Sequence, residues 1–160
     1  MISFTQFVLL LLLRSKKHIS SSMVYSILLL VTRKPGMSWP DFKHHWETQH
    51  VPLIKRFVGD DFPLSHTRHY FERNNDDKPN VTYGNPHGVD FDALAILTFS
   101  DRDHHARFSE KLSNQETHEL HIADLEKFID LGRFKQVMIE GTEATGRDGG
   151  MVGWRFVGSV

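Results

Sequence analysis

Residues 25–57, YSILLLVTRKPGMSWPDFKHHWETQHVPLIKRF, contain the pattern that decides the fold. The apolar run over 25–32 predicts a short strand, which the following Arg-Lys-Pro-Gly turn ends. Ser38, with Asp41 three residues later, is similar to the capping box that opens a helix. Pro52 lacks the amide hydrogen that an interior helical turn needs, so we expect the helix to bend or break near it.

The rest of the chain continues the alternation of strand-like and helix-like segments. Strands are predicted over 64–72, 89–99 and 134–142, helices over 101–114 and 115–131, and a polar loop over 73–88. The resulting order is β-α-β-β-α-β. Two strand-helix-strand units on one antiparallel sheet define the α+β, ferredoxin-like arrangement. We therefore expect one domain over residues 23–143.

The two ends of the chain do not fit this pattern. The apolar run over 7–13 is too short to span a membrane, and its positive charges follow it instead of preceding it as in a secretory signal. We expect residues 1–22 to be an extension outside the fold, with targeting as a weaker alternative. Residues 144–160 form a Gly-rich tail. Without a recognisable address, the cytoplasm is the default localisation, and a membrane partner is not expected.

Composition excludes several classes of function. The 160 residues hold 19 Lys and Arg against 20 Asp and Glu, and this balance argues against a nucleic-acid partner, which would need a basic face. The absence of cysteine excludes disulfides, zinc-thiolate sites and cysteine nucleophiles. The 11 histidines stand out, because histidine titrates near neutrality and is the commonest general acid or base.

The strands also carry a prediction about assembly. A sheet with helices on one side should alternate apolar and polar residues, yet residues 27–31 and 93–97 are apolar throughout. Both faces of the sheet are therefore apolar, and the helices can cover only one. We expect a homodimer closed sheet to sheet. The alternative is that the C-terminal tail folds across the open face.

His50 is the first candidate for chemistry. It lies on the apolar stripe of the first helix, four residues after Trp46 and beside the break at Pro52, where a pocket could open. The alternative for such a residue is a core histidine with satisfied hydrogen bonds. His44 and His45 point elsewhere and are expected to face solvent.

His118 and His121 form a second pair on a helix. They share a face with the apolar residues that follow, so both should point inward if the helix extends back that far. Their spacing is one residue short of the H-E-x-x-H zinc motif, and no third ligand has a fixed spacing. We therefore predict no metal site, and expect these imidazoles to line an apolar pocket and bind substrate.

The second strand offers two sets of side chains, one on each face. One face holds His66, Arg68 and Tyr70, and the other holds Thr67, His69 and Phe71. The first set could hold a carboxylate or a phenolate through its cation and its phenol. The alternative is a strand exposed to water, and the sequence leaves open which face meets the helices.

At this point the residues resemble a known family. The match comprises an R-K-P-G-like turn after a strand and then the pattern F-x-x-x-W-x-x-x-H-x-P-L, here Phe42, Trp46, His50, Pro52 and Leu53. This resembles the EthD family, as do Tyr70 and the stretch over 123–130, although Leu125 interrupts the usual acidic pair there. The resemblance covers about residues 23–143.

The resemblance implies a dimeric α+β barrel and a histidine at the position of His50 that acts as acid or base in cofactor-free enzymes. Similar members include fungal enzymes that decarboxylate or dehydrate aromatic polyketides of the atrochrysone and anthraquinone type. Others are cyclases, lactone isomerases and accessory proteins. Our hypothesis is a cofactor-free lyase, most simply a decarboxylase, in which His50 moves the proton and Arg68 or Tyr70 orients the acid. Trp46 would pack against the rings.

Other readings stay open at the level of sequence. Dehydration would use His50 as base and Tyr70 or His118 as acid. A non-catalytic dimer that binds a hydrophobic small molecule or assists a partner enzyme would tolerate loss of His50 but not loss of packing around Trp46. Haem or flavin chemistry occurs in distant barrel relatives, and a Soret band in the purified protein would reveal haem.

Overall fold

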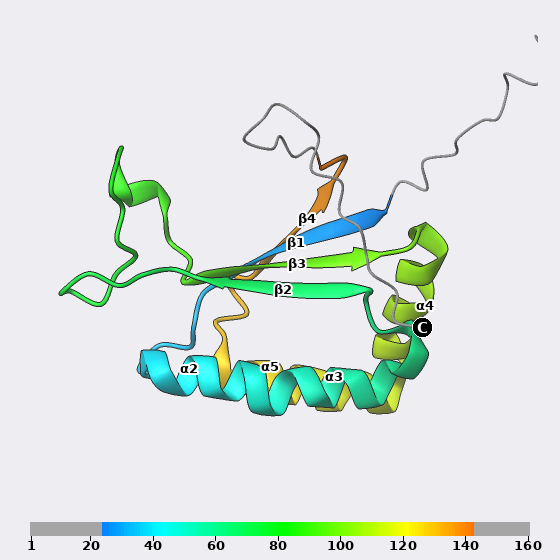
Figure 1. Ribbon diagram of the computed structural model, residues 1–160. Helices are drawn as coiled ribbons and strands as arrows, with labels where there is room; N and C mark the ends of the chain where they lie inside the picture. Colours follow the sequence, from blue (N-terminus) through cyan, green and yellow to red (C-terminus); the bar gives the residue numbers. More distant parts are fainter. Residues whose placement is uncertain (1–23, 143–160) are drawn as a thin grey trace, which may run out of the picture.

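The computed structural model describes residues 24–142, which fold into a four-stranded sheet with helices packed on one side (Figure 1). The strands are β1 (Tyr25–Val31), β2 (Ser65–Tyr70), β3 (Ala93–Phe99) and β4 (Lys135–Ile139). The main helices are α2 (Trp39–His45), α3 (Val51–Val58), α4 (Arg102–Ser113) and α5 (Gln115–Phe128). Shorter helical turns are η1 (Trp46–His50), η2 (Gly59–Asp61) and η3 (Pro86–Gly88). The predicted extension over 1–22 and the Gly-rich tail lie outside the described residues.

The sheet confirms the predicted fold class. Its strand order is β2-β3-β1-β4, and all neighbouring strands run antiparallel. The two strands of each strand-helix-strand unit are therefore separated by a strand of the other unit. This interleaving is the ferredoxin-like α+β arrangement.

The core forms where the helices meet one face of the sheet. Phe42 of α2, Phe99 of β3 and Phe128 of α5 are among the largest fully buried side chains. Along β3, alternate residues from Ala93 to Phe99 are buried toward the helices, as the period-2 geometry of a strand requires. No helix among residues 24–142 is long and apolar enough to cross a membrane.

The opposite face of the sheet is also apolar, as the unbroken apolar runs predicted. Leu28 pairs across the strands with Ile96 and with Val137, so the three side chains share one face. Val137 is 46% exposed. Figure 1 shows α2, α3 and α5 together on one side of the sheet, and α4 beside the end of the strands. Within the described residues, this face has no covering helix.

The first helix is interrupted beside Pro52, as predicted, but the helix does not end there. A single π-helical turn, η1, joins α2 to α3. The amide of Val51 donates to the carbonyl oxygen of Trp46, five residues earlier. A widened turn of this kind accommodates a proline, whose ring would otherwise press on the carbonyl four residues before it. The widened turn contains both Trp46 and His50.

Candidate active site

A cavity of about 160 Å³ lies between the sheet and the helices. Aliphatic and aromatic side chains, including those from β1, β3, α3, α4 and α5, make up most of its wall. Its polar lining residues are His50, His66, His121 and Gln136. Trp46 also lines it. An apolar cavity with a few convergent polar groups is the usual form of a small-molecule site.

His50 is anchored at one edge of this cavity by a buried carboxylate. Its Nδ1 lies 2.9 Å from Oδ2 of Asp124, which belongs to α5 and is only 5% exposed. Because an ionised carboxylate only accepts hydrogen bonds, Nδ1 carries the hydrogen and donates it. Among the described residues, Nε2 makes no hydrogen bond. The histidine is thus oriented from behind, with Nε2 left to meet an occupant of the cavity.

The other oxygen of Asp124 holds a second histidine. Nε2 of His45 donates to Oδ1 at 3.0 Å, and the His45 ring stacks on Phe128 with centroids 4.8 Å apart. Burial alone would raise the pKa of the Asp124 carboxyl, but the hydrogen bonds and charges of the two histidines outweigh it and lower the pKa. His45 was expected to face solvent. That expectation is wrong, because α5 packs where the isolated helix would have met water.

The sequence reasoning missed Asp124 as a site residue. The available signal was its place on the helix, because Asp124 shares the apolar stripe of Leu125 and Phe128 and lies three residues after His121. A carboxylate on a buried stripe needs a partner, since an unpaired buried charge is costly. From its place on this stripe, Asp124 could have been predicted to have a hydrogen-bonding partner. Which residue is the partner follows only from the packing of α5 against η1.

His66 and His121 complete the polar lining and are neutral near pH 7. Burial, followed by the charge of Arg68, lowers the pKa of His66 to about 3. Burial, followed by the charge of His50, lowers the pKa of His121 to about 4. The His121 ring stacks near that of His50 with centroids 5.7 Å apart. The Nε2 atom of His66 is buried without a hydrogen-bond partner among the described residues.

The structure answers which face of β2 meets the helices, but it corrects two side-chain roles. His66, Arg68 and Tyr70 face the helices, because they pair with the buried residues of β3. Only His66 lines the cavity. Glu47 on η1 accepts two hydrogen bonds from Arg68, at 2.8 and 2.7 Å, and one from the Tyr70 hydroxyl at 2.6 Å. The expected carboxylate-binding cation is already bound to a carboxylate of the chain itself.

The same cluster sets the ionisation of Tyr70 and Glu47. Burial, and then the hydrogen bond to Glu47, raises the pKa of Tyr70 above its ordinary value. The hydrogen bond from Arg68 is the main cause that lowers the pKa of Glu47. Tyr70 therefore stays protonated, with its proton donated to Glu47 and directed away from the cavity wall.

His118 also differs from its prediction. It lies in the second turn of α5 on the exposed side, whereas His121 reaches the cavity. The prediction that both histidines point inward therefore holds for His121 and fails for His118, which is exposed. Within residues 24–142, no group of three or more His, Asp or Glu side chains is arranged to hold a metal ion.

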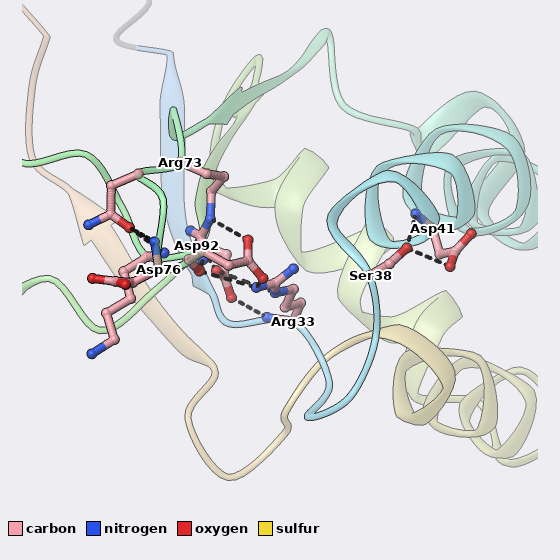
Figure 2. A network of polar contacts seen from close by, with 9 residues as sticks. Arg33, Ser38, Asp41, Arg73, Asp76 and Asp92 are labelled. Atoms are coloured by element: carbon pink, nitrogen blue, oxygen red, sulfur yellow. Dashed lines mark hydrogen bonds and ion pairs between the residues drawn. The ribbon is translucent and has the colours of Figure 1, made fainter.

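A second hollow lies at the end of the sheet where β1 leads into the turn before α2. It is wider, about 960 Å³, and is lined by the β1–α2 turn and the loops before β3 and β4. Beside it, Asp92 holds Nη1 of Arg73 at 2.7 Å and the backbone amide of Arg33 at 2.8 Å (Figure 2). Both arginines also lie over the Trp39 ring. We call Arg33, Arg73, Asp77 and Asp92 the Asp92 network.

The charges in the Asp92 network are already neutralised by one another. Asp77 bonds the side chains of both arginines, and Arg133 pairs with Asp90 nearby. These pairs tie the loop after β2 to the end of β1, and they leave no excess of either charge for a ligand. The apolar cavity, with its anchored histidine, is the better candidate site.

Fold and site thus define the class of protein: an α+β ferredoxin-like domain with one histidine anchored in an apolar cavity. The sequence profile of the EthD domain matches residues 34–132. The chain belongs to the EthD domain family. The match contains η1, α5 and every residue of the His50–Asp124–His45 group.

Comparisons with solved structures find similar chains at low sequence identity. An EthD family protein from Bacillus halodurans is 15% identical, with a TM-score of 0.47, covering 75% of this chain and 100% of its own. SnoaB, a cofactor-independent oxygenase from Streptomyces nogalater, is 12% identical with a TM-score of 0.44, covering 75% and 94%. A NIPSNAP-like domain protein from Burkholderia xenovorans is 11% identical with a TM-score of 0.48, covering 76% and 87%. A search of curated protein sequences gives no match.

Proposed function

We propose that this protein is a cofactor-free lyase that decarboxylates an aromatic polyketide acid of the anthraquinone type. The observation that supports it most is the orientation of His50, held at Nδ1 by Asp124 with Nε2 open to an apolar cavity. A base fixed in this way can take up a proton and return it within one turnover. The carboxylate behind it stabilises the imidazolium that forms in between.

The reaction needs only one proton carrier. A β-keto acid, or an ortho-hydroxy aromatic acid in its keto tautomer, enters with its carboxyl proton and gives that proton to Nε2 of His50. The bond between the carboxyl carbon and the ring then breaks, CO₂ leaves, and the electron pair moves to the neighbouring ketone as an enolate. His50 returns the proton to the enolate, which ends as a ketone or, in an aromatic ring, as a phenol. Proton and electrons balance without an external reactant.

The wall of the cavity favours the loss of charge from the carboxylate. Among the described residues, neither Arg nor Lys lines the cavity. A carboxylate there has exchanged water for apolar walls, and its charge spreads over a larger group as CO₂ departs. Desolvation by the apolar wall thus takes the place of the role predicted for Arg68, whose guanidinium is bound to Glu47. Acid/base help from His50 accounts for about 10²–10⁴-fold, and positioning and desolvation would provide the rest.

Dehydration is the weaker candidate on these residues. It requires a second group that donates a proton to the departing hydroxyl. Tyr70 donates its proton to Glu47, and His118 is exposed. His66 and His121 do line the cavity, but their lowered pKa values leave them neutral at pH 7 and poor as acids. Decarboxylation does not need them as acids.

The size of the cavity limits how a substrate is held. An apolar cavity of about 150 Å³ accepts one benzene ring, and this cavity has about the same volume. We propose that the ring bearing the carboxyl group enters it, while the remaining rings of a polycyclic acid extend through its opening. A one-ring hydroxybenzoic acid is then a minimal substrate.

We also propose that a second copy of the chain covers the open face of the sheet. The face is apolar along three adjacent strands and includes Leu28, Ile96 and Val137. A flat apolar sheet is complementary to itself, which favours a two-fold, sheet-to-sheet contact. Light scattering should give twice the mass of the chain, and Ile96→Lys should return it to one. A single-chain mass for both would favour the tail as the cover instead.

The test of the activity is an end-point mass analysis. The full chain and His50→Asn are each incubated with an anthraquinone-type carboxylic acid and with a one-ring hydroxybenzoic acid. Loss of CO₂ with the wild type alone would support the decarboxylase and the role of His50. Loss of water alone would favour the dehydratase. Loss of neither from a folded protein would favour a non-catalytic binding module, and a Soret band would contradict a cofactor-free enzyme.

A further inference from the structure

His45 has no part in the proton transfer just described, yet it occupies half of the carboxylate that supports it. Its Nε2 lies 3.0 Å from Oδ1 of Asp124, and His50 lies 2.9 Å from Oδ2. The two histidines come from adjacent turns of one helix and meet the same side chain of α5. His45 is not among the residues that line the cavity, so any effect on an occupant must pass through Asp124.

A carboxylate shared by two donors is a weaker acceptor for each of them. Hydrogen bonds to an ionised carboxylate draw negative charge toward the donor, which leaves less for the other oxygen. A general acid/base must hold its proton and also release it within each turnover. A carboxylate that served His50 alone would stabilise the imidazolium more strongly and slow that release.

We propose that His45 is a positioning residue that fixes the orientation of Asp124 and limits how tightly Asp124 holds the proton on His50. The inference rests on the proposed proton transfer by His50, but not on the identity of the substrate.

The surroundings of Asp124 assign this role to His45 in particular. Lys127, on the same helix, lies 3.9 Å from Oδ1, beyond hydrogen-bond distance, and its side chain is 65% exposed. From α5, His121 stacks on His50, and from β2, His66 faces the same cavity. Neither makes a hydrogen bond to Asp124. Among the described residues, His45 is the second hydrogen-bond donor to this carboxylate.

The chain offers matched variants that separate the hydrogen bond from the packing. His45→Phe keeps a flat ring to stack on Phe128 but removes the donor. His45→Gln keeps an amide donor that can reach Oδ1. His45→Asn keeps a polar amide that is too short to reach it. Asp124→Asn removes the charge from the acceptor itself. Folding of each is checked from the amide spectrum of the sheet.

The readout is the proton NMR resonance of the His50 Nδ1–H, assigned by its loss in His50→Ala, in the full chain without substrate. A stronger acceptor moves a hydrogen-bonded proton downfield. We expect His45→Phe and His45→Asn to move it downfield, His45→Gln to leave it near the wild-type position, and Asp124→Asn to move it upfield. With a substrate that turns over, we expect kcat about tenfold lower in His45→Phe with KM unchanged, and recovery in His45→Gln.

Two results would overturn the inference. An unchanged or upfield resonance in a folded His45→Phe or His45→Asn would show that His45 does not weaken the acceptor. If kcat fell as far in His45→Gln as in His45→Phe, the role of His45 would be in packing alone. The resonance does not depend on turnover, so a downfield shift without CO₂ release would uphold the shared carboxylate and contradict only the decarboxylase.

Discussion

Two buried carboxylates in this molecule are each flanked by two basic side chains, but the bases differ. Asp92 lies between Arg33 and Arg73 at one end of the sheet, and Asp124 lies between two histidines beside the cavity. The side chains of both acids are less than a tenth exposed. Each acid is therefore shared by two bases, but the two carboxylates serve different purposes.

The difference follows from the proton chemistry of the bases. An arginine keeps its proton at every pH that a protein meets, so Asp92 holds fixed charges together and can only stabilise structure. A histidine gains and loses its proton near neutrality, so Asp124 can support a change of charge on His50. The comparison assigns the Asp92 network to stability and the Asp124 group to chemistry, and each assignment can be tested separately.

The largest expected effect is on activity, from a change at His50. His50→Asn keeps an amide near the position of Nδ1, so Asp124 retains a donor, but the group corresponding to Nε2 is lost. We expect decarboxylation to fall about 10²–10⁴-fold, with a stability loss of about 1–2 kcal/mol for the smaller side chain. Product mass and urea unfolding measure the two effects. An active His50→Asn would remove His50 from the mechanism.

The converse is expected at Asp92. Asp92→Asn leaves two arginines, each with a side chain about a tenth exposed, with the largely exposed Asp77 as their one shared carboxylate among the four residues of the network. Removing one partner of a buried ion pair costs about 3–5 kcal/mol. We expect a loss of that size in urea unfolding, while the specific activity of the folded fraction stays within about twofold. A loss of activity without a loss of stability would place Asp92 in the site.

The two regions also differ in how far the sequence could predict them. The order of elements and the position of His50 follow from local patterns, because the strand, the turn and the apolar stripe are each contiguous in sequence. Asp124 lies 74 residues from His50, and no local pattern shows which helix faces which. Arg68 and Tyr70 were grouped on one face of β2, but the sequence left open which face meets the helices. Their binding to Glu47 depends on the π-helical turn, which the sequence did not predict.

We expect acid to lower the free energy of unfolding, because two histidines that line the cavity have lowered pKa values. The pKa values of His66 and His121 are lowered to about 3 and about 4, so below pH 6.5 the unfolded chain binds protons that the folded chain does not. Their stabilisation is complete above pH 6.5 and is lost as the pH falls toward 4. The lowered pKa of Asp124 adds a further loss at more acidic pH.

The expected slope is up to about 1.4 kcal/mol per pH unit for each histidine. Urea unfolding between pH 7 and pH 4.5 measures it. His121→Asn should remove the contribution of one histidine to this slope. A change in the Asp92 network should instead shift the free energy of unfolding equally at every pH, without changing the slope. An equal slope in wild type and His121→Asn would contradict the neutral, buried state of His121.

The smallest effect separates charge from shape within the Asp92 network. Arg73→Lys keeps the positive charge beside Asp92 but loses the planar guanidinium that lies 5.0 Å from the centroid of Trp39. Because Asp92 keeps its charge balance, only the forked hydrogen bonds and the stacking are lost, about 1 kcal/mol. If Arg73→Lys instead costs as much as Asp92→Asn, the network depends on the shape of arginine more than on its charge. Asp92 and Asp124 would then differ in the shape of the flat group that each binds, a guanidinium or an imidazole ring. Whether that group titrates would no longer explain the difference between the two carboxylates.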